Sequence, residues 1–106
     1  VVSAMAHITG GGIEGNLPRV LPNSLDAVID TTTWEVPSIF TFLQNRGDVE
    51  TSEMYRVFNM GIGYILAVRP SFADSVVRQL QRDGESARVI GELRSGTGAV
   101  TMEGLS

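Results

Sequence analysis

Cysteine and lysine are both absent from this 106-residue chain, and histidine occurs once, at His7. Without cysteine the chain forms no disulfide and has no thiolate nucleophile, and a zinc site built from a cysteine or histidine cluster is excluded. Without lysine it has neither a Schiff-base residue nor a phosphate loop of the Walker type. A metal ion would need carboxylates or a bound phosphate, and we predict no metal ligands within this chain.

All eight basic residues are arginine, and the twelve acidic residues leave a net charge of −4. An acidic chain lacks the basic surface on which nucleic-acid binding depends, so we predict no nucleic-acid partner. The longest apolar run, residues 61–68, is far shorter than the roughly 20 residues that span a bilayer. The sequence therefore predicts a cytoplasmic protein with no membrane contact.

A single domain is expected, because 106 residues, 42% of them hydrophobic, can enclose one core but hardly two. The chain begins with Val1-Val2-Ser3, inside an apolar stretch that is typical of a strand interior. We therefore expect a fragment of a longer polypeptide, with a further domain upstream.

Alternating and β-branched residues predict strands, and apolar residues at helical spacing with start and stop signals predict helices. The expected strands cover residues 3–9, 25–30, 64–68, 87–93 and 99–103. The expected helices cover residues 15–20, 48–58, a segment from Pro37 and Ser38 to Gly47, and a segment from a capping box at Ser71 and Asp74 to Gly84. This order predicts an α+β fold with a mixed sheet that carries helices.

Packing can be anticipated for three of these elements. The apolar residues of segment 36–43 fall on one helical face and are expected to be core. The uninterrupted apolar run at 64–68 predicts a central strand that is covered on both faces. The turn at 95–98 is expected to join the last two strands into a hairpin.

His7 lies just before Thr9 and a run of three glycines, Gly10, Gly11 and Gly12. Glycine reaches positive φ readily and leaves its N–H group bare, so several such groups can converge on one phosphate. His7 could transfer a proton near neutral pH, and Thr9 could donate its hydroxyl to a phosphate oxygen. The plainer alternatives are a simple turn at the glycines, a structural histidine, and a threonine that only helps the chain to turn.

Arg19 follows the glycines on the predicted short helix, where its guanidinium could clamp a phosphate through two hydrogen bonds. Asn16 could cap that helix or contact a ligand. The plainer alternatives are a solvated charge at the helix end for Arg19 and capping for Asn16. Neither residue alone identifies a site.

A second glycine motif covers residues 53–63 and runs from a helix into a loop with Asn59, Gly61 and Gly63. These two glycines again leave backbone N–H groups bare. Because a strand follows, the motif is not a dinucleotide-binding fingerprint, which needs a following helix.

Three segments together resemble the aminoimidazole ribonucleotide synthetase family, the cyclo-ligases of purine synthesis. These segments are His7–Gly12 (HITGGG), Asn16–Pro22 (NLPRVLP) and Glu53–Gly63 (EMYRVFNMGIG). Trp34, the segment 40–47 and residues 90–92 extend the resemblance over nearly the whole chain. One departure is Gly15, where the family commonly has an acidic residue directly before the asparagine and this chain has Glu14 one place earlier. The role of that acid is therefore open.

The resemblance implies a three-layer α+β fold with partial likeness to the ferredoxin fold, and implies that the chain is most of the C-terminal domain of a two-domain enzyme. An N-terminal domain would supply the main site for ATP and magnesium and the main homodimer contact. The implied reaction is ATP-dependent ring closure, in which formylglycinamidine ribonucleotide becomes aminoimidazole ribonucleotide. This chain alone is expected to be inactive and to hold neither ATP nor magnesium.

By the same resemblance, the phosphate of a ribonucleotide substrate would lie on Thr9 and the N–H groups of Gly10–Gly12, with Arg19 as a clamp. His7 would transfer a proton. The opposite wall of a cleft that faces the other domain would be shaped by Asn59, Gly61 and Gly63. Two alternatives stay open: a stand-alone module that binds a phosphate ligand or another protein, and a domain of the related formylglycinamide ribonucleotide amidotransferase.

Overall fold

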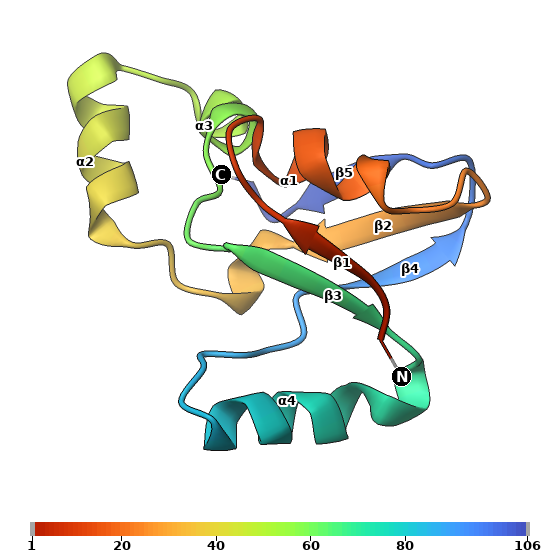
Figure 1. The fold of residues 1–106 in the computed structure, drawn as a ribbon. Helices are drawn as coiled ribbons and strands as arrows, with labels where there is room; N and C mark the ends of the chain where they lie inside the picture. The colour runs from red at the N-terminus through yellow and green to blue at the C-terminus, as the bar shows by residue number, and fades with distance from the viewer. Residues whose placement is uncertain (1, 106) are drawn as a thin grey trace.

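The computed structural model describes residues 2–105 and has the α+β fold that the sequence predicts (Figure 1). The strands are β1 (Val2–His7), β2 (Leu25–Asp30), β3 (Tyr64–Val68), β4 (Gly91–Ser95) and β5 (Val100–Glu103). The α-helices are α1 (Gly12–Asn16), α2 (Ser38–Gly47), α3 (Thr51–Val57) and α4 (Ala73–Arg82). Short 3-10 turns are Leu17–Arg19 (η1), Thr31–Thr33 (η2) and Pro70–Phe72 (η3).

The strands form two separate sheets rather than the single mixed sheet expected from the sequence. In the first sheet β1 and β3 pair antiparallel, with His7 opposite Tyr64. Alternation along β1 sends Ala6 into the core and leaves Met5 and His7 exposed. In the second sheet β2 lies between β4, which is antiparallel to it, and β5, which is parallel.

The predicted hairpin is wrong, because β2 separates its two strands. The Asp26 Oδ1 atom accepts hydrogen bonds from the three backbone N–H groups of residues 97–99, at 2.8 to 3.0 Å. The Gly96 N–H group also donates to the Ser24 carbonyl oxygen at 2.8 Å. These bonds tie the turn to the beginning of β2, so β4 and β5 lie on opposite sides of that strand.

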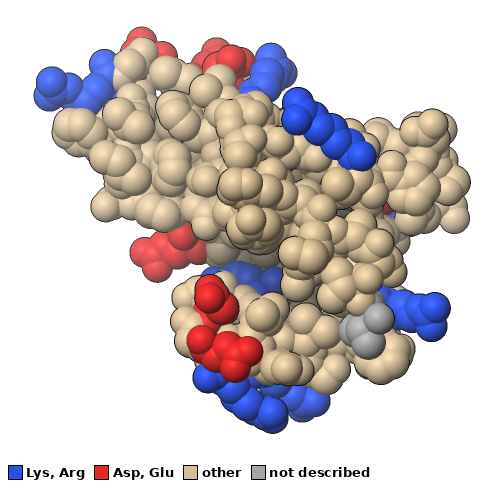
Figure 2. Space-filling view, viewed as in Figure 1, with Lys and Arg blue, Asp and Glu red and all other residues tan. Residues whose placement is uncertain are grey.

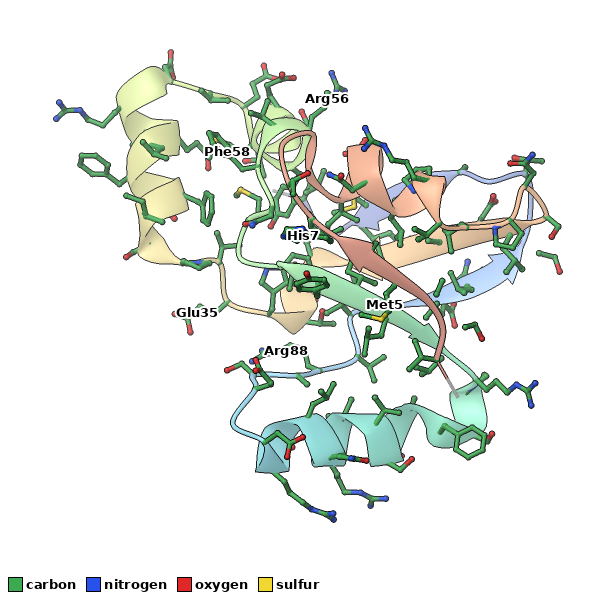
Figure 3. All side chains as sticks on the ribbon, viewed as in Figure 1. Met5, His7, Glu35, Arg56, Phe58 and Arg88 are labelled. Carbon is green, nitrogen blue, oxygen red and sulfur yellow. The ribbon has the colours of Figure 1, made fainter. Side chains whose placement is uncertain are left out.

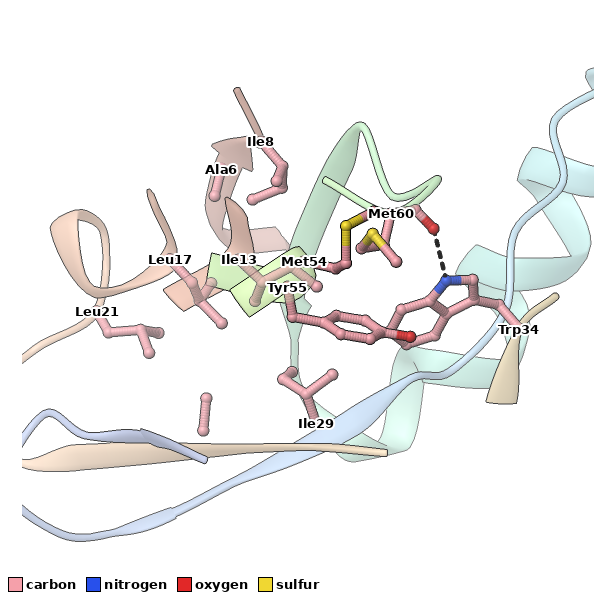
Figure 4. Packing of buried hydrophobic residues seen from close by; sticks show 11 residues of the cluster. Ala6, Ile8, Ile13, Leu17, Leu21, Ile29, Trp34, Met54, Tyr55 and Met60 are labelled. Carbon is pink, nitrogen blue, oxygen red and sulfur yellow. Dashed lines mark hydrogen bonds between the residues drawn. The ribbon is translucent and has the colours of Figure 1, made fainter. Parts of the chain in front are cut away.

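The core lies between the second sheet on one side and β1, α1 and α3 on the other (Figure 4). Trp34 donates its indole N–H to the Met60 carbonyl oxygen at 3.1 Å and meets the Tyr55 ring edge-on, so its polar atom is satisfied while its ring is buried. Burial raises the pKa of the Tyr55 phenol above its ordinary value of 10.0. The buried hydrophobic residues are Ala6, Ile8, Ile13, Leu17, Leu21, Ala27, Ile29, Trp34, Met54, Tyr55 and Met60.

The apolar stripe expected to be core on α2 is largely exposed. Ile39 is 54% exposed and Leu43 is 40% exposed, and the helix has no buried residue. Val36 and Phe40 do pack against the core, Phe40 with its ring 5.7 Å from that of Phe58. Because α2 stands at the edge of the molecule beside α3 (Figure 1), only the side that faces α3 is covered.

Three further expectations are corrected by the structure. Among the described strands β3 pairs only with β1, although its apolar run predicts a central strand. The capping box at Ser71 and Asp74 is absent, because η3 covers that turn and α4 begins at Ala73 without a side-chain cap. The last predicted strand pair also begins later, because residues 85–90 form no regular element and β4 starts at Gly91.

Several element ends also differ from the prediction. The strand expected over 3–9 ends at His7, and the helix expected over 15–20 divides into α1 and η1. The helix expected over 48–58 shortens to α3, because Phe58 is already extended. Within residues 2–105, none of the helices combines the length and the hydropathy that crossing a bilayer requires.

Substituting Asp26 tests how the second sheet is held. The N–H groups of Ala99 and Thr97 in particular lower the pKa of Asp26 from its ordinary value of 3.8. A carboxyl group with a lowered pKa stabilises the fold above its unfolded pKa, and this stabilisation is lost as the pH falls through the folded pKa. Asp26→Asn should therefore lower the melting temperature near neutral pH, and the difference from the wild type should shrink with acidification.

The measurement is a series of thermal melts between about pH 7 and about pH 2. Glu85→Gln removes an acidic charge from an exposed residue and serves as the control. A melting temperature of Asp26→Asn equal to that of the wild type at neutral pH would show that the carboxylate does not hold the turn.

Candidate functional site

Both glycine motifs lie at the same end of the first sheet. Residues 8–12 follow β1 and residues 58–63 precede β3, and because these strands are antiparallel the two loops meet. The Ile8 N–H group donates to the Gly63 carbonyl oxygen at 2.8 Å, and the Gly11 N–H group donates to the Val57 carbonyl oxygen at 3.2 Å. We refer to residues 8–12 and 58–63 together as the paired loops.

Gly12 packs directly against the backbone of α3. Its φ is +65°, and a Cβ atom built on it would lie 2.1 Å from the Tyr55 carbonyl oxygen and 2.8 Å from that of Phe58. Both neighbours are backbone atoms and cannot swing away as a side chain could. Glycine is therefore required here for packing as well as for its positive φ.

Asn16 holds the first loop from the inside. Its Nδ2 atom donates to the Gly12 carbonyl oxygen at 2.8 Å and lies 3.3 Å from the carbonyl oxygens of Thr9 and Gly10. Its Oδ1 atom accepts the Thr9 hydroxyl at 3.2 Å. Asn16 is 6% exposed and makes no side-chain helix cap, so the capping role expected from the sequence is wrong. Its side chain instead braces the loop, and contact with a ligand stays a prediction.

The glycine run offers a ligand fewer N–H groups than the sequence suggests. The Gly11 N–H group is bonded to Val57, and the Gly12 N–H group donates to the Thr9 carbonyl oxygen at 3.1 Å. Gly10 is exposed, and nothing lies within 4 Å of where its Cβ would be. A phosphate on all three N–H groups therefore stays a prediction that this geometry does not favour. The exposed residues of the loop are Thr9, Gly10 and Gly11.

The second loop is shaped by its own backbone contacts. The Asn59 Oδ1 atom accepts the Gly61 N–H group at 2.9 Å. Gly61 has a φ of +103°, and a Cβ atom there would lie 2.6 Å from Pro37 Cδ. Met60 also has a positive φ, of 54°, and its carbonyl oxygen accepts the Trp34 indole. Asn59 and Gly61 therefore act first as turn formers, and Gly63 accepts the hydrogen bond that links the two loops.

His7 lies at the exposed end of β1 (Figure 3), and its ring stacks on that of Tyr64 on β3. Their ring centroids are 4.7 Å apart and the ring planes differ by 10°. The stack covers one face of the imidazole while leaving the residue exposed, which suits a group that exchanges protons with a ligand. Sequence reasoning missed Tyr64, although the cross-strand register of two alternating strands would have pointed to it.

Arg19 is the last residue of η1 and is exposed. The structure therefore presents three reactive or charged groups in the region of the paired loops and η1: the His7 imidazole, the Thr9 hydroxyl and the Arg19 guanidinium. Among the described residues, no group of three or more histidine, aspartate or glutamate residues could hold a metal ion. Taken singly, a guanidinium or a hydroxyl can bind an anion and an imidazole can transfer a proton.

Replacing Gly12 with alanine tests the contact between the loop and α3. Strain at a positive φ costs about 1–3 kcal/mol for a residue with a side chain, and the carbonyl contacts add to it. Gly12→Ala should destabilise the protein by about 3 kcal/mol or more, measured by urea unfolding. Gly10→Ala, with open space and no positive φ, should change the free energy of unfolding by less than about 1 kcal/mol. Equal effects of the two substitutions would contradict this assignment.

Comparisons with known proteins agree with the resemblance carried by the three sequence segments. Residues 1–103 match the family described as AIR synthase related protein, C-terminal domain. The chain is 50% identical over 103 residues to a phosphoribosylformylglycinamidine cyclo-ligase of Bacillus pumilus, covering 97% of this chain and 30% of that protein. It is 46% identical over 99 residues to the protein of the same name in Bacillus licheniformis, covering 93% of this chain and 29% of that protein.

The chain thus spans about 30% of the length of these curated relatives. The part it shares with them includes β1, both of the paired loops and η1, where the candidate residues lie. The family match covers nearly the entire chain, and the chain belongs to the AIR synthase related family, whose C-terminal domain it matches.

Proposed function

We propose that this chain is the C-terminal part of an ATP-dependent cyclo-ligase that converts formylglycinamidine ribonucleotide to aminoimidazole ribonucleotide in the cytoplasm. The observation that carries the proposal is the 50% identity, over 97% of the chain, to a protein named as phosphoribosylformylglycinamidine cyclo-ligase. The folded arrangement supports it, because the two most specific motifs form one unit at the end of the first sheet.

Ring closure requires the formyl oxygen of the substrate to become a leaving group. In the proposed reaction the terminal phosphoryl group of ATP moves to that oxygen and ADP is released. A nitrogen of the same substrate then attacks the formyl carbon, the carbon–oxygen bond breaks with release of phosphate, and the nitrogen loses a proton. Activation thus replaces a poor leaving oxygen with phosphate, and the new carbon–nitrogen bond closes the imidazole.

The residues of this chain bind and orient the ribonucleotide in this proposal. The Arg19 guanidinium donates two hydrogen bonds to the ribonucleotide phosphate. The Thr9 hydroxyl donates a further one, exchanging its bond to the Asn16 Oδ1 atom for one to the phosphate. The exposed His7 imidazole accepts the proton released from the attacking nitrogen. Asn59 and the second of the paired loops form the adjoining wall, which orients the substrate rather than making or breaking bonds.

ATP and magnesium belong, in this proposal, to the rest of the enzyme, together with the homodimer contact. The described residues contain no cluster of three acidic or histidine side chains that fits a magnesium ion, and the chain has no lysine. No step is therefore assigned to magnesium on this chain. The ribonucleotide and the N-terminal domain of the same enzyme are its proposed partners.

The test is an assay of the full-length enzyme with formylglycinamidine ribonucleotide and ATP, in which aminoimidazole ribonucleotide and ADP are measured. His7→Ala should lower kcat by about a hundredfold or more, because it removes a general base, and should change KM much less. Met5→Ala is the matched control, because Met5 is also exposed and lies two residues earlier on the same face of β1.

Unchanged turnover of His7→Ala would remove the proton-transfer role from His7. Failure of the wild-type enzyme to form aminoimidazole ribonucleotide would contradict the proposed function itself. Glutamine-dependent amination of formylglycinamide ribonucleotide by the same preparation would instead identify the amidotransferase.

A further inference from the structure

A largely apolar groove of about 670 Å³ runs between β3, α4 and the segment 86–93, and it reaches Ala27 and Ile29 of β2 and Leu17 and Leu21 near η1. Figure 2 shows the surface hollowed between the lobe that contains α4 and the rest of the molecule. Apolar side chains of β3 and α4 line the groove, among them Leu66, Val76 and Val77. An open apolar groove of this kind is a site where another part of a protein packs.

One wall of the groove is a strand with a free edge. Among the described strands β3 pairs only with β1, so the backbone groups on its other edge have no strand partner. Its five residues, Tyr64–Val68, form a continuous apolar run of the kind found in strands with neighbours on both sides. A free and apolar strand edge is a template for one more strand.

The opposite wall is a helix with an incompletely covered apolar side. Val76, Val77 and Leu80 of α4 line the groove, yet α4 has no buried residue. Figure 1 shows α4 standing away from both sheets, joined to β3 by η3 and to β4 by an irregular segment. The apolar face of α4 and the free edge of β3 thus flank the same unfilled space.

The relatives are longer than this chain, and the additional polypeptide is the candidate to fill this space. The chain spans about 30% of those proteins and matches a C-terminal domain, so most of their length precedes the matched region. Val2 pairs with Val68, where β3 passes into η3 and α4. A polypeptide leading into Val2 therefore arrives beside the end of the groove.

We propose that an extended segment of the full-length enzyme, preceding residue 1, pairs along the free edge of β3 and closes the groove against α4. This inference rests on the proposed function only in requiring the longer polypeptide. The added strand would give the β3 backbone hydrogen bonds on both edges and would bury its apolar side chains together with those of α4.

The test is residue-resolved hydrogen–deuterium exchange of the full-length enzyme over Tyr64–Val68. In an antiparallel pair, alternate N–H groups of β3 point toward β1 and the others point to the free edge. If a strand is added, both sets should exchange slowly, with the outer set at least about tenfold slower than an unpaired strand edge. The inner set, bonded to β1, is the internal control.

Fast exchange of the outer set beside a slow inner set would overturn the proposal. Protection of the outer set that disappears on dilution would also overturn it, since a second copy would then be the occupant. The proposal would also be overturned if the gene encoded no residues before residue 1. Cyclo-ligase activity with an unprotected outer edge would leave the proposed function standing, and protection without activity would leave only this inference standing.

A pair of variants tests the wall formed by α4. Val77→Glu places a charge in the groove, and Gln79→Glu places the same charge on an exposed position of the same helix. In the full-length enzyme Val77→Glu should speed exchange of the outer β3 set by about tenfold or more, whereas Gln79→Glu should not. Equal exchange in the two variants would contradict closure of the groove against α4.

Discussion

The close approach of Gly12 to the C-terminal end of α3 is the constraint on which the rest of this structure depends. A carbonyl oxygen of α3 occupies the space that any Cβ at residue 12 would need. The approach brings Gly11 within hydrogen-bonding distance of Val57 and sets the first loop beside the second. The core beneath, with Ile13 on α1 and Met54 on α3, is buried by the same contact.

The polar groups near this contact divide into two kinds. Asn16, Asn59 and the N–H groups of Gly11 and Gly12 are used within the protein, where they give the loops one shape. His7, Thr9 and Arg19 are exposed, although the Thr9 hydroxyl also donates to the Asn16 Oδ1 atom. Hydrogen bonds within the loops thus support the backbone that carries Thr9 and follows His7, and support of this kind helps a site to position a ligand.

The sequence predicted the strands and helices that depend on residues close together in the chain. The pairing of strands and the shape of the loops depend on contacts between distant residues, and these were not predicted. The strand at 25–30 and the helix from 38 to 47 are local patterns, and both are confirmed. The hairpin failed because the Asp26 carboxylate binds N–H groups more than seventy residues away, a contact with no signal in the sequence between β4 and β5. The glycine run was recognised, but the Gly11 N–H group is bonded to Val57 of α3, a contact that no spacing within the run reveals.

The most direct test of this account is calorimetric titration of the full-length enzyme with formylglycinamidine ribonucleotide and, separately, with ATP. We propose that the region of the paired loops and η1 binds the phosphate of the ribonucleotide. Arg19→Ala should weaken ribonucleotide binding by about tenfold or more and leave ATP binding unchanged, while Arg78→Ala on the exposed side of α4 should affect neither. Unchanged ribonucleotide binding by Arg19→Ala, or an equal loss of ATP binding, would contradict the claim.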